Sequence, residues 1–193
     1  GGPGKNAFDG ISKEKVREVS GDVSELAKDL RRVEVTMPEQ LNKPVDWQKI
    51  ADDLTLHEQV LCVVNTRKQC RELFQLMPPD TIHLSRMMCS AHLTETIERI
   101  KTRLAENLPV RVISTQLIEA GVDIDFPVVY RALAGLDSIA QCAGRCNREG
   151  KLNTYGRLGI TQVFIPHQAA PQGLLRKGAD TAKELIATSN MAE

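Results

Sequence analysis

The residues best suited to chemistry lie in one short stretch, DSIAQCAGRCNREG, which runs from Asp137 to Gly150. Arg145 and Arg148 stand four and seven positions after Gln141. If Asp137 caps a helix that continues through the stretch, these three side chains project from the same side. Two guanidinium groups on one face repel each other unless an anion lies between them, and arginine binds phosphate oxygens as a bidentate fork. Two arginines alone would suit a solvated basic helix end. Together with Gln141 and Gly144 at this spacing, they favour phosphate recognition.

The composition limits what else the chain can do. Its 193 residues suffice for one domain, or for a domain with an appendage. The apolar fraction of 41% is enough for a core, and it is mainly aliphatic because aromatic residues make up only 4%. The 25 basic and 25 acidic side chains cancel. Bulk charge therefore cannot drive binding to nucleic acid, and any such contact must come from local patches.

The cysteines and the hydropathy pattern indicate the compartment. The five cysteines are an odd number with no C-x-x-C pair, which is typical of free thiols in a reducing cytoplasm. Cys142 and Cys146 lie four positions apart, but no histidine is near enough in sequence to complete a zinc site. We therefore expect no metal site in this chain. The sequence has no run of 18 apolar residues, so we also expect a cytoplasmic protein without a membrane partner.

Strand and helix patterns alternate on either side of the 137–150 stretch. Apolar and polar residues alternate over 31–37, which predicts a strand with one solvent-exposed face and with Val33, Val35 and Met37 on its inner face. Further strands are expected at 59–65, 81–84, 110–115, 127–133 and 160–165. Helices are expected after Asp46, after Thr66, from Ser90 to Leu104 and over 172–187. This alternation of strands and helices predicts an α/β fold with three layers, in which helices cover both faces of a mostly parallel sheet.

Two loops that follow predicted strands add candidate residues, because function collects at strand ends in parallel sheets. Asn65, Thr66 and Arg67 follow the 59–65 strand and suit a nucleic-acid phosphate, although these residues taken alone are better explained by an ordinary helix cap. In TQLIEAGVDIDFP, Thr115 and Gln116 could bond phosphate or base, and Gly121 would allow a close approach of the backbone. Asp123 lies among apolar residues and needs a fixed partner, either a ribose hydroxyl or the backbone of a turn. Glu119 could pair with an arginine of the 137–150 stretch or face water.

The phosphate-binding half of a nucleotide site is missing from this sequence. A P-loop requires G-x-x-x-x-G-K-[ST], whereas Gly4-Lys5 is followed by Asn6 and Gly150-Lys151 by Leu152. Asp52-Asp53 follows a helix, where a magnesium-binding acid should end an apolar strand. The chain therefore has the arginine half of an ATP site alone.

The order of these motifs resembles the second RecA-like domain of superfamily 2 helicases. More narrowly, it is similar to the helicase-nuclease that degrades target DNA in type I CRISPR interference. The resemblance rests on VLCVVNTRKQCRELF, on VRVISTQLIEAGVDIDFPVVYRALAGLDSIAQ and on GRCNREG, within residues 31–167. DEAD-box proteins would have His-Arg where this chain has Ala140-Gln141. The family's nuclease needs a His-Asp dipeptide, which the sequence lacks, so we expect the nuclease domain to lie outside this chain.

The resemblance implies a RecA-like fold and a role for each candidate residue. Arg145 and Arg148 would reach the γ-phosphate of ATP, with Gln141 near the nucleotide. Gly121, Asp123 and Gly144 would lie by the nucleotide, and Asn65, Thr66, Arg67, Thr115 and Gln116 along single-stranded DNA. A separate P-loop domain would bind most of the ATP and Mg²⁺.

The resemblance also implies an organisation and a set of partners. Residues 31–167 would form the second RecA-like domain. Residues 1–30 would be an expression remnant and a polar lead-in, and 168–193 a C-terminal helical segment. The implied partners are the first RecA-like domain, the nuclease domain and a CRISPR RNA-guided surveillance complex. Two alternatives stay open: another superfamily 2 DNA or RNA helicase, and a non-catalytic regulatory or nucleic-acid-binding module of the same fold.

Overall fold

The computed structural model describes residues 25, 28, 30–85, 88–119, 122–168 and 174–190, with the side chains of the last segment described from 176 to 185. The chain divides into two units, residues 1–31 and residues 32–193. The fold described below is that of the second unit. The predicted polar lead-in at 1–30 lies almost entirely outside the described residues.

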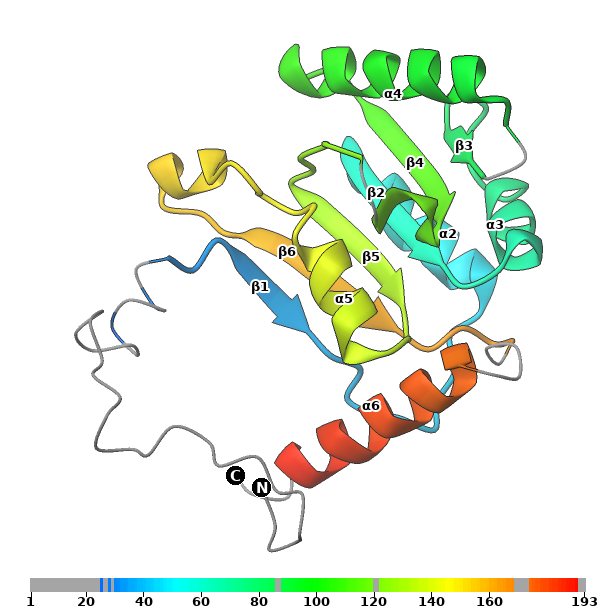
Figure 1. Ribbon diagram of the computed structural model, residues 1–193, viewed down its shortest axis with the longest axis vertical. Helices are drawn as coiled ribbons and strands as arrows, with labels where there is room; N and C mark the ends of the chain where they lie inside the picture. The colour runs from blue at the N-terminus through cyan, green and yellow to red at the C-terminus, as the bar shows by residue number, and fades with distance from the viewer. Residues whose placement is uncertain are drawn as a thin grey trace, which may run out of the picture. The chain divides into compact units, whose positions relative to one another are not determined.

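A single parallel sheet forms the centre of the second unit (Figure 1). Its strand order is β1-β6-β5-β2-β4-β3, and every neighbouring pair is parallel. The strands are β1 (Val33–Thr36), β2 (Gln59–Val64), β3 (Ile82–Leu84), β4 (Val110–Thr115), β5 (Val128–Ala132) and β6 (Gly159–Phe164). All six coincide with predicted strands to within about two residues at each end, so the predicted parallel sheet is confirmed.

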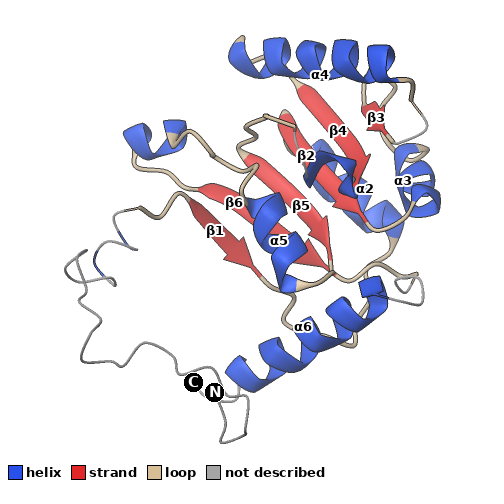
Figure 2. Ribbon diagram, in the orientation of Figure 1, coloured by secondary structure: helices blue, strands red, loops and turns tan. Residues whose placement is uncertain are grey.

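Helices cover both faces of this sheet, as Figure 2 shows. They are α2 (Trp47–Thr55), α3 (Arg67–Phe74), α4 (Ser90–Ala105), α5 (Leu136–Ala143) and α6 (Leu174–Asn190), with 3₁₀ turns η2 (Gln116–Glu119) and η3 (Lys151–Tyr155). On one face, Val60, Cys62 and Val64 of β2 pack against α2 and α3. On the other face, Leu61 and Val63 pack in a cluster with residues of α4 and α5. Burial on both faces explains why β2 reads as one continuous apolar run.

The predicted helix starts on the first face are confirmed. Asp46 Oδ1 accepts a hydrogen bond from Trp47 N at 2.8 Å, and Thr66 Oγ1 accepts one from Gln69 N at 3.1 Å. Trp47 packs edge-on against Phe164, with ring centroids 6.2 Å apart. Among the described residues, no helix is long and apolar enough to cross a bilayer.

Strand β1 departs from its predicted burial. Val35 is 43% exposed, although the period-two pattern placed it on the inner face. In the sheet formed by the described residues, the strand lies at one edge and has β6 as its single neighbour, so its cover is incomplete. The alternation therefore identified the strand correctly and the burial of Val35 incorrectly.

The helix predicted through the 137–150 stretch is wrong in its second half. Helix α5 begins after Gly135 and ends at Ala143, so Asp137 lies in its first turn and is not its cap. Beyond it the backbone bends back, with Asn147 at φ 43° and Gly150 at φ 70°, a left-handed conformation that favours glycine. Gln141, Arg145 and Arg148 therefore do not share one helical face.

Helix α6 packs against the rest of the second unit through a close backbone approach. Ala179 joins Leu133, Ile139, Val163 and Ile165 in a buried cluster. A Cβ atom added at Gly178 would lie 3.2 Å from the Cα of Gly135, a distance that few real Cβ contacts reach. Glycine at this position lets α6 lie against the start of α5.

Candidate functional site

The predicted site residues fall into two groups in space. The first, here called the strand-end group, comprises Asn65, Thr66, Arg67, Thr115 and Gln116. Strands β2 and β4 are neighbours, and Val64 pairs with Thr115 in their register. The segments 65–67 and 115–116 therefore leave the sheet side by side at its carboxyl edge, as the parallel topology requires.

Asn65 is a buried member of the strand-end group. Its side chain is 7% exposed, accepts a hydrogen bond from Arg131 Nη1 at 2.8 Å and donates one to Leu133 O at 2.9 Å. Its backbone N–H donates to Gln69 Oε1 at 3.0 Å. Asn65 thus ties the end of β2 to the end of β5 and to α3, and its amide group faces the protein interior.

Thr66 and Arg67 are the more accessible residues of this segment. Thr66 is half-buried and caps α3, whereas Arg67 is exposed at the first helical position. The first amides of a helix point outward without intrahelical partners and attract anions. Thr115 and Gln116 are half-buried beside them. The strand-end group therefore offers a hydroxyl, a guanidinium and a helix start on one edge.

The second group, here called the arginine group, comprises Asp123, Arg145 and Arg148. Its two chain segments run side by side through a parallel bridge between Phe126 and Cys146. Phe126 N donates to Arg145 O and Asn147 N to Phe126 O, both at 2.9 Å. This pairing ends α5 and brings the segment 145–148 to the amino end of β5, whose first residue is Val128. The arginine group and the strand-end group therefore lie at opposite ends of the strands.

Arg148 is held by the loop that precedes β5. Its Nη1 lies 2.5 Å from Asp123 Oδ1, and its backbone N–H donates to Asp125 Oδ1 at 2.7 Å. Its carbonyl oxygen accepts a hydrogen bond from the Arg32 guanidinium. The side chains of Arg148 and Asp123 are 46% and 76% exposed, so water screens their ion pair. The sequence suggested a ribose hydroxyl or the backbone of a turn as the partner of Asp123, whereas its partner within this chain is the side chain of Arg148.

Arg145 lies deeper than Arg148. It is half-buried, and its Nη2 donates to the backbone carbonyl of Glu119 at 2.8 Å. Its Nε is buried and has no hydrogen-bond partner within the described part of the chain. An unpaired N–H on a buried cation is costly, and a phosphate oxygen could satisfy it.

The remaining predicted nucleotide contacts flank the arginine group. Gln141 is exposed in the last turn of α5, and Gly144 is the exposed residue that ends this helix. The φ of Gly144 is −65°, so its backbone does not itself require glycine. Gly121 lies outside the described residues.

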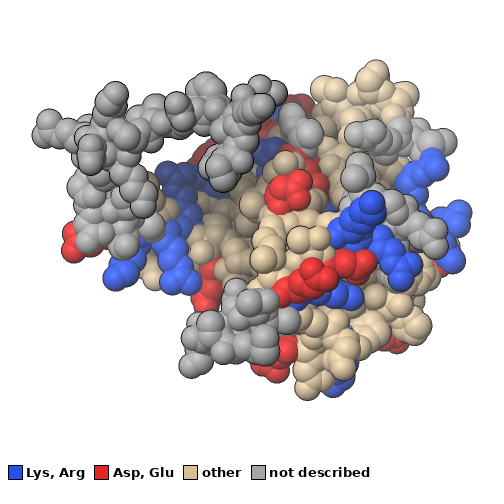
Figure 3. All heavy atoms as spheres, turned by 60° about the horizontal axis from the view of Figure 1, so that its bottom comes forward, with Lys and Arg blue, Asp and Glu red and all other residues tan. Residues whose placement is uncertain are grey.

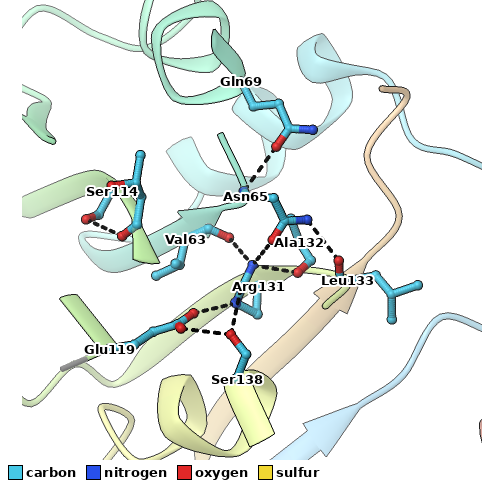
Figure 4. Close-up of polar contacts among 10 residues, drawn as sticks. Val63, Asn65, Gln69, Ser114, Glu119, Arg131, Ala132, Leu133 and Ser138 are labelled. Carbon is cyan, nitrogen blue, oxygen red and sulfur yellow. Dashed lines mark hydrogen bonds and ion pairs between the residues drawn. The ribbon is translucent and has the colours of Figure 1, made fainter. Parts of the chain in front are cut away.

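The sequence interpretation missed a buried charged network around Arg131 (Figure 4). This network contacts Asn65 of the strand-end group and Arg145 of the arginine group. Arg131 Nε lies 2.9 Å from Glu119 Oε1, and the exposed fractions of the two side chains are 0% and 9%. Ser138 bridges them, because its hydroxyl accepts from Arg131 Nη2 and donates to Glu119 Oε2. Glu119 was expected to pair with an arginine of 137–150 or to face water. Its carboxylate instead pairs with Arg131, and only its backbone carbonyl meets Arg145.

The sequence did contain a signal for this network. Arg131 stands inside VVYRA, an apolar run that reads as a strand covered on both faces. A charge in such a strand requires a buried partner of opposite sign.

Most histidine and cysteine side chains of the described part of the chain lie at separate, largely buried positions. Burial lowers the pKa of His83, whose ring lies 5.3 Å from that of Phe74, while His92 is exposed on α4. Burial raises the pKa of Cys142 to about 12 and that of Cys146 to about 11, so both remain protonated thiols near neutral pH. Burial likewise raises the pKa of Cys62 and Cys70, and Cys89 is exposed. Within the described residues, no three His, Cys, Asp or Glu side chains gather as a metal site.

The six-stranded parallel sheet, covered by helices on both faces, has the α/β RecA-like fold. Residues 56–151 match the family model described as "CRISPR-associated nuclease/helicase Cas3, C-terminal". This segment belongs to that family, as the helicase C-terminal domain of Cas3.

Individual relatives agree with the assignment. Over 75 residues the chain is 54% identical to the CRISPR-associated nuclease/helicase Cas3 of Haloferax volcanii, a match that covers 39% of this chain and 8% of the relative. The structure of T. fusca Cas3-ATP superposes with a TM-score of 0.60 at 18% identity, covering 83% of this chain and 22% of that one. A chain in a structure described as "CRISPR RNA-guided surveillance complex, pre-nicking" gives a TM-score of 0.58 at 20% identity, covering 83% and 23%. The chain thus spans a small part of each relative.

Proposed function

We propose that this chain is the second motor domain of an ATP-dependent helicase that translocates on single-stranded DNA during CRISPR interference. One observation carries the proposal. The arginine group and the strand-end group are each assembled from distant segments of a Cas3-type helicase domain, at opposite ends of one sheet. One protein can thereby bind a nucleotide at one edge of the domain and a DNA strand at the other.

The arginine group has the chemistry of a γ-phosphate sensor. Arg148 is held at its side chain by a screened pair with Asp123, so a phosphate can replace that carboxylate at small cost. Arg145 offers a buried N–H without a partner among the described residues. Gln141 and Gly144 would border the same nucleotide, and Asp123, once released, could accept from the ribose. ATP bound there supplies the phosphoryl group that is hydrolysed, and a P-loop domain would hold most of it together with Mg²⁺.

The strand-end group would follow the DNA backbone. Thr66 and the first amides of α3 would bind one phosphate, with Arg67, Thr115 and Gln116 beside it. Asn65 would contribute by holding this loop, because its amide group is used inside the protein. Closure of the two motor domains around ATP would then move the strand.

The remaining partners follow from the same assignment. The first RecA-like domain and the nuclease domain would belong to the full-length protein, and a CRISPR RNA-guided surveillance complex would deliver the DNA. The similar chain in the surveillance-complex structure supports this partner. Such a protein would act in the cytoplasm, where phage and plasmid DNA enters.

The isolated 193-residue chain is expected to hydrolyse no ATP above a buffer blank, with or without single-stranded DNA. Its sequence lacks a P-loop and a magnesium-binding acid, so the phosphates cannot be held for in-line attack. Phosphate release measured over hours checks this. Turnover that disappears in an Arg148→Ala variant would contradict the two-domain site. The full-length protein, assayed in parallel, should hydrolyse ATP faster with DNA than without it.

The isolated chain is also expected to bind single-stranded DNA weakly. Basic and acidic side chains are interspersed on the face drawn in Figure 3, and the formal charge is zero. Few phosphates can then be neutralised, so log affinity should fall against log salt with a slope on the order of −1 to −3. Fluorescence anisotropy at several salt concentrations measures the slope. Arg67→Ala should make it shallower, whereas the matched variant Arg99→Ala, exposed on α4, should leave it unchanged. Sub-nanomolar binding at physiological salt would contradict the prediction.

A further inference from the structure

The network around Arg131 links the strand-end group to the arginine group. Arg131 is fully buried on β5, where two of its guanidinium nitrogens donate hydrogen bonds and the third forms an ion pair (Figure 4). Nη1 donates to Asn65 Oδ1 at 2.8 Å and to Ala132 O at 2.7 Å, while Nη2 donates to Ser138 Oγ at 2.9 Å. Nε faces the Glu119 carboxylate. The same cation therefore holds the end of β2, the end of η2 and the first half of α5.

The path continues from Glu119 to the arginine group. The carboxylate of Glu119 is fixed by Arg131 and Ser138, and its backbone carbonyl accepts from Arg145 Nη2 at 2.8 Å. Direct contacts thus run from Asn65 through Arg131 and Glu119 to Arg145. Each of these four residues belongs to a different segment, so a shift of one segment moves the bonding partner of the next.

Stability alone does not account for such a network. A buried ion pair is offset by the desolvation of both charges, and apolar side chains of similar volume often stabilise a fold equally well. What the ion pair adds is geometry, because the planar fork of Arg131 holds the side chains of Asn65, Ser138 and Glu119 at once. Through these contacts Arg131 holds Asn65 and also Glu119, the residue of η2 whose backbone carbonyl is bonded to Arg145.

We propose that Arg131 is a positioning residue that couples DNA contact at the strand-end group to the placement of Arg145 at the nucleotide. A phosphate bound beside Thr66 shifts Asn65, and Arg131 transmits the shift through Glu119 to the carbonyl that holds Arg145. By linkage the effect is reciprocal, so bound nucleotide also raises the affinity for DNA. The inference rests on the proposed function, because it requires both ligands.

The test uses the full-length protein and the double variant Glu119→Met/Arg131→Met. This change removes both buried charges together, leaving neither unpaired, and keeps apolar volume in their place. The coupling is read as the ratio of kcat with saturating single-stranded DNA to kcat without DNA. We expect this ratio to fall at least about 10-fold, within the range of typical allosteric couplings. The gain in DNA affinity caused by a non-hydrolysable ATP analogue should fall by a similar factor.

Two further variants separate coupling from charge and from folding. Arg131→Lys retains a cation for Glu119, but one ammonium cannot also reach Asn65 and Ser138 as the fork does, so the ratio should fall here too. The matched control is Asp80→Asn/Arg111→Met, which removes a strand-borne arginine and its carboxylate partner outside the network. Its ratio should equal that of the wild type.

The outcomes distinguish a failure of the proposed coupling from a failure of the proposed helicase function. A wild-type protein whose ATPase does not respond to DNA overturns the proposed function. The coupling is refuted if the wild-type ATPase responds to DNA and the double variant, or Arg131→Lys, has the same ratio of kcat with DNA to kcat without DNA. The Arg131–Glu119 ion pair would then have a purely structural role. If the double variant does not fold, as judged by circular dichroism, Arg131→Lys alone decides, and a wild-type ratio there refutes the proposal.

Discussion

Replacing Arg148 with alanine in the full-length protein is expected to lower the kcat for ATP hydrolysis at least about 100-fold, with a much smaller rise in KM. Arginines that meet developing charge on the γ-phosphate contribute about 10³ to 10⁵ in rate, because the charge appears only in the transition state. Arg145→Ala should act in the same direction. Steady-state kinetics over a range of ATP concentrations separates kcat from KM.

The structure makes Arg148 the cleaner of these two tests. Its side chain is 46% exposed and, among the described residues, pairs with exposed Asp123, so its loss should change the free energy of unfolding by less than about 1 kcal/mol. Arg145 also holds the Glu119 carbonyl, so its removal should cost some stability as well. Arg148→Lys should recover little activity, because an ammonium cannot reproduce the bidentate fork. Arg99→Ala, at an exposed position of α4, is the matched control. A normal kcat for folded Arg148→Ala would exclude the γ-phosphate role.

The largest loss of stability is expected from Arg131→Met. The change leaves the Glu119 carboxylate 9% exposed without its partner, and breaking a buried pair in this way costs about 3–5 kcal/mol. For a chain of this size, that corresponds to a fall in Tm of roughly 6–20 °C. Urea unfolding and thermal melts of the 193-residue chain measure it.

The companion variants assign the cause of that loss. Glu119→Met/Arg131→Met should be more stable than Arg131→Met, because no unpaired charge remains in the core. Arg111→Met is the matched control. Its ion pair with Asp80 spans 3.7 Å and is partly exposed, so its loss should cost under about 1 kcal/mol. Equal destabilisation of the single and double variants would indicate that the packing of Arg131, and not its charge, is the dominant contribution.

The fold could be predicted from the sequence because its signals are local. The 59–65 run is apolar at every central position since β2 is buried on both faces, and Asp46 and Thr66 cap helices within three residues of themselves. The burial of Val35 could not be predicted, because the alternation does not reveal that β1 is an edge strand.

For the site, the sequence indicated candidate residues but not how they are arranged. The spacing of Arg145 and Arg148 suggested one helix, but the bridge from Cys146 to Phe126 and the left-handed Asn147 end it early. These are tertiary features with no local pattern. The pairing of Arg131 with Glu119 also depends on the packing of η2 and α5 against β5. The one sequence signal for this ion pair is the unusual position of Arg131 in an apolar strand.

The unequal burial of the thiols also gives the domain a ready attachment point for a spectroscopic probe. Cys62, Cys70, Cys142 and Cys146 are buried, whereas Cys89 is exposed just before α4. Thiol-directed dyes react with accessible thiolates, so brief labelling of the native chain should mark Cys89 selectively. With an acceptor dye placed on the partner motor domain, energy transfer from this position would record opening and closing during turnover, without any cysteine having to be introduced into or removed from this domain.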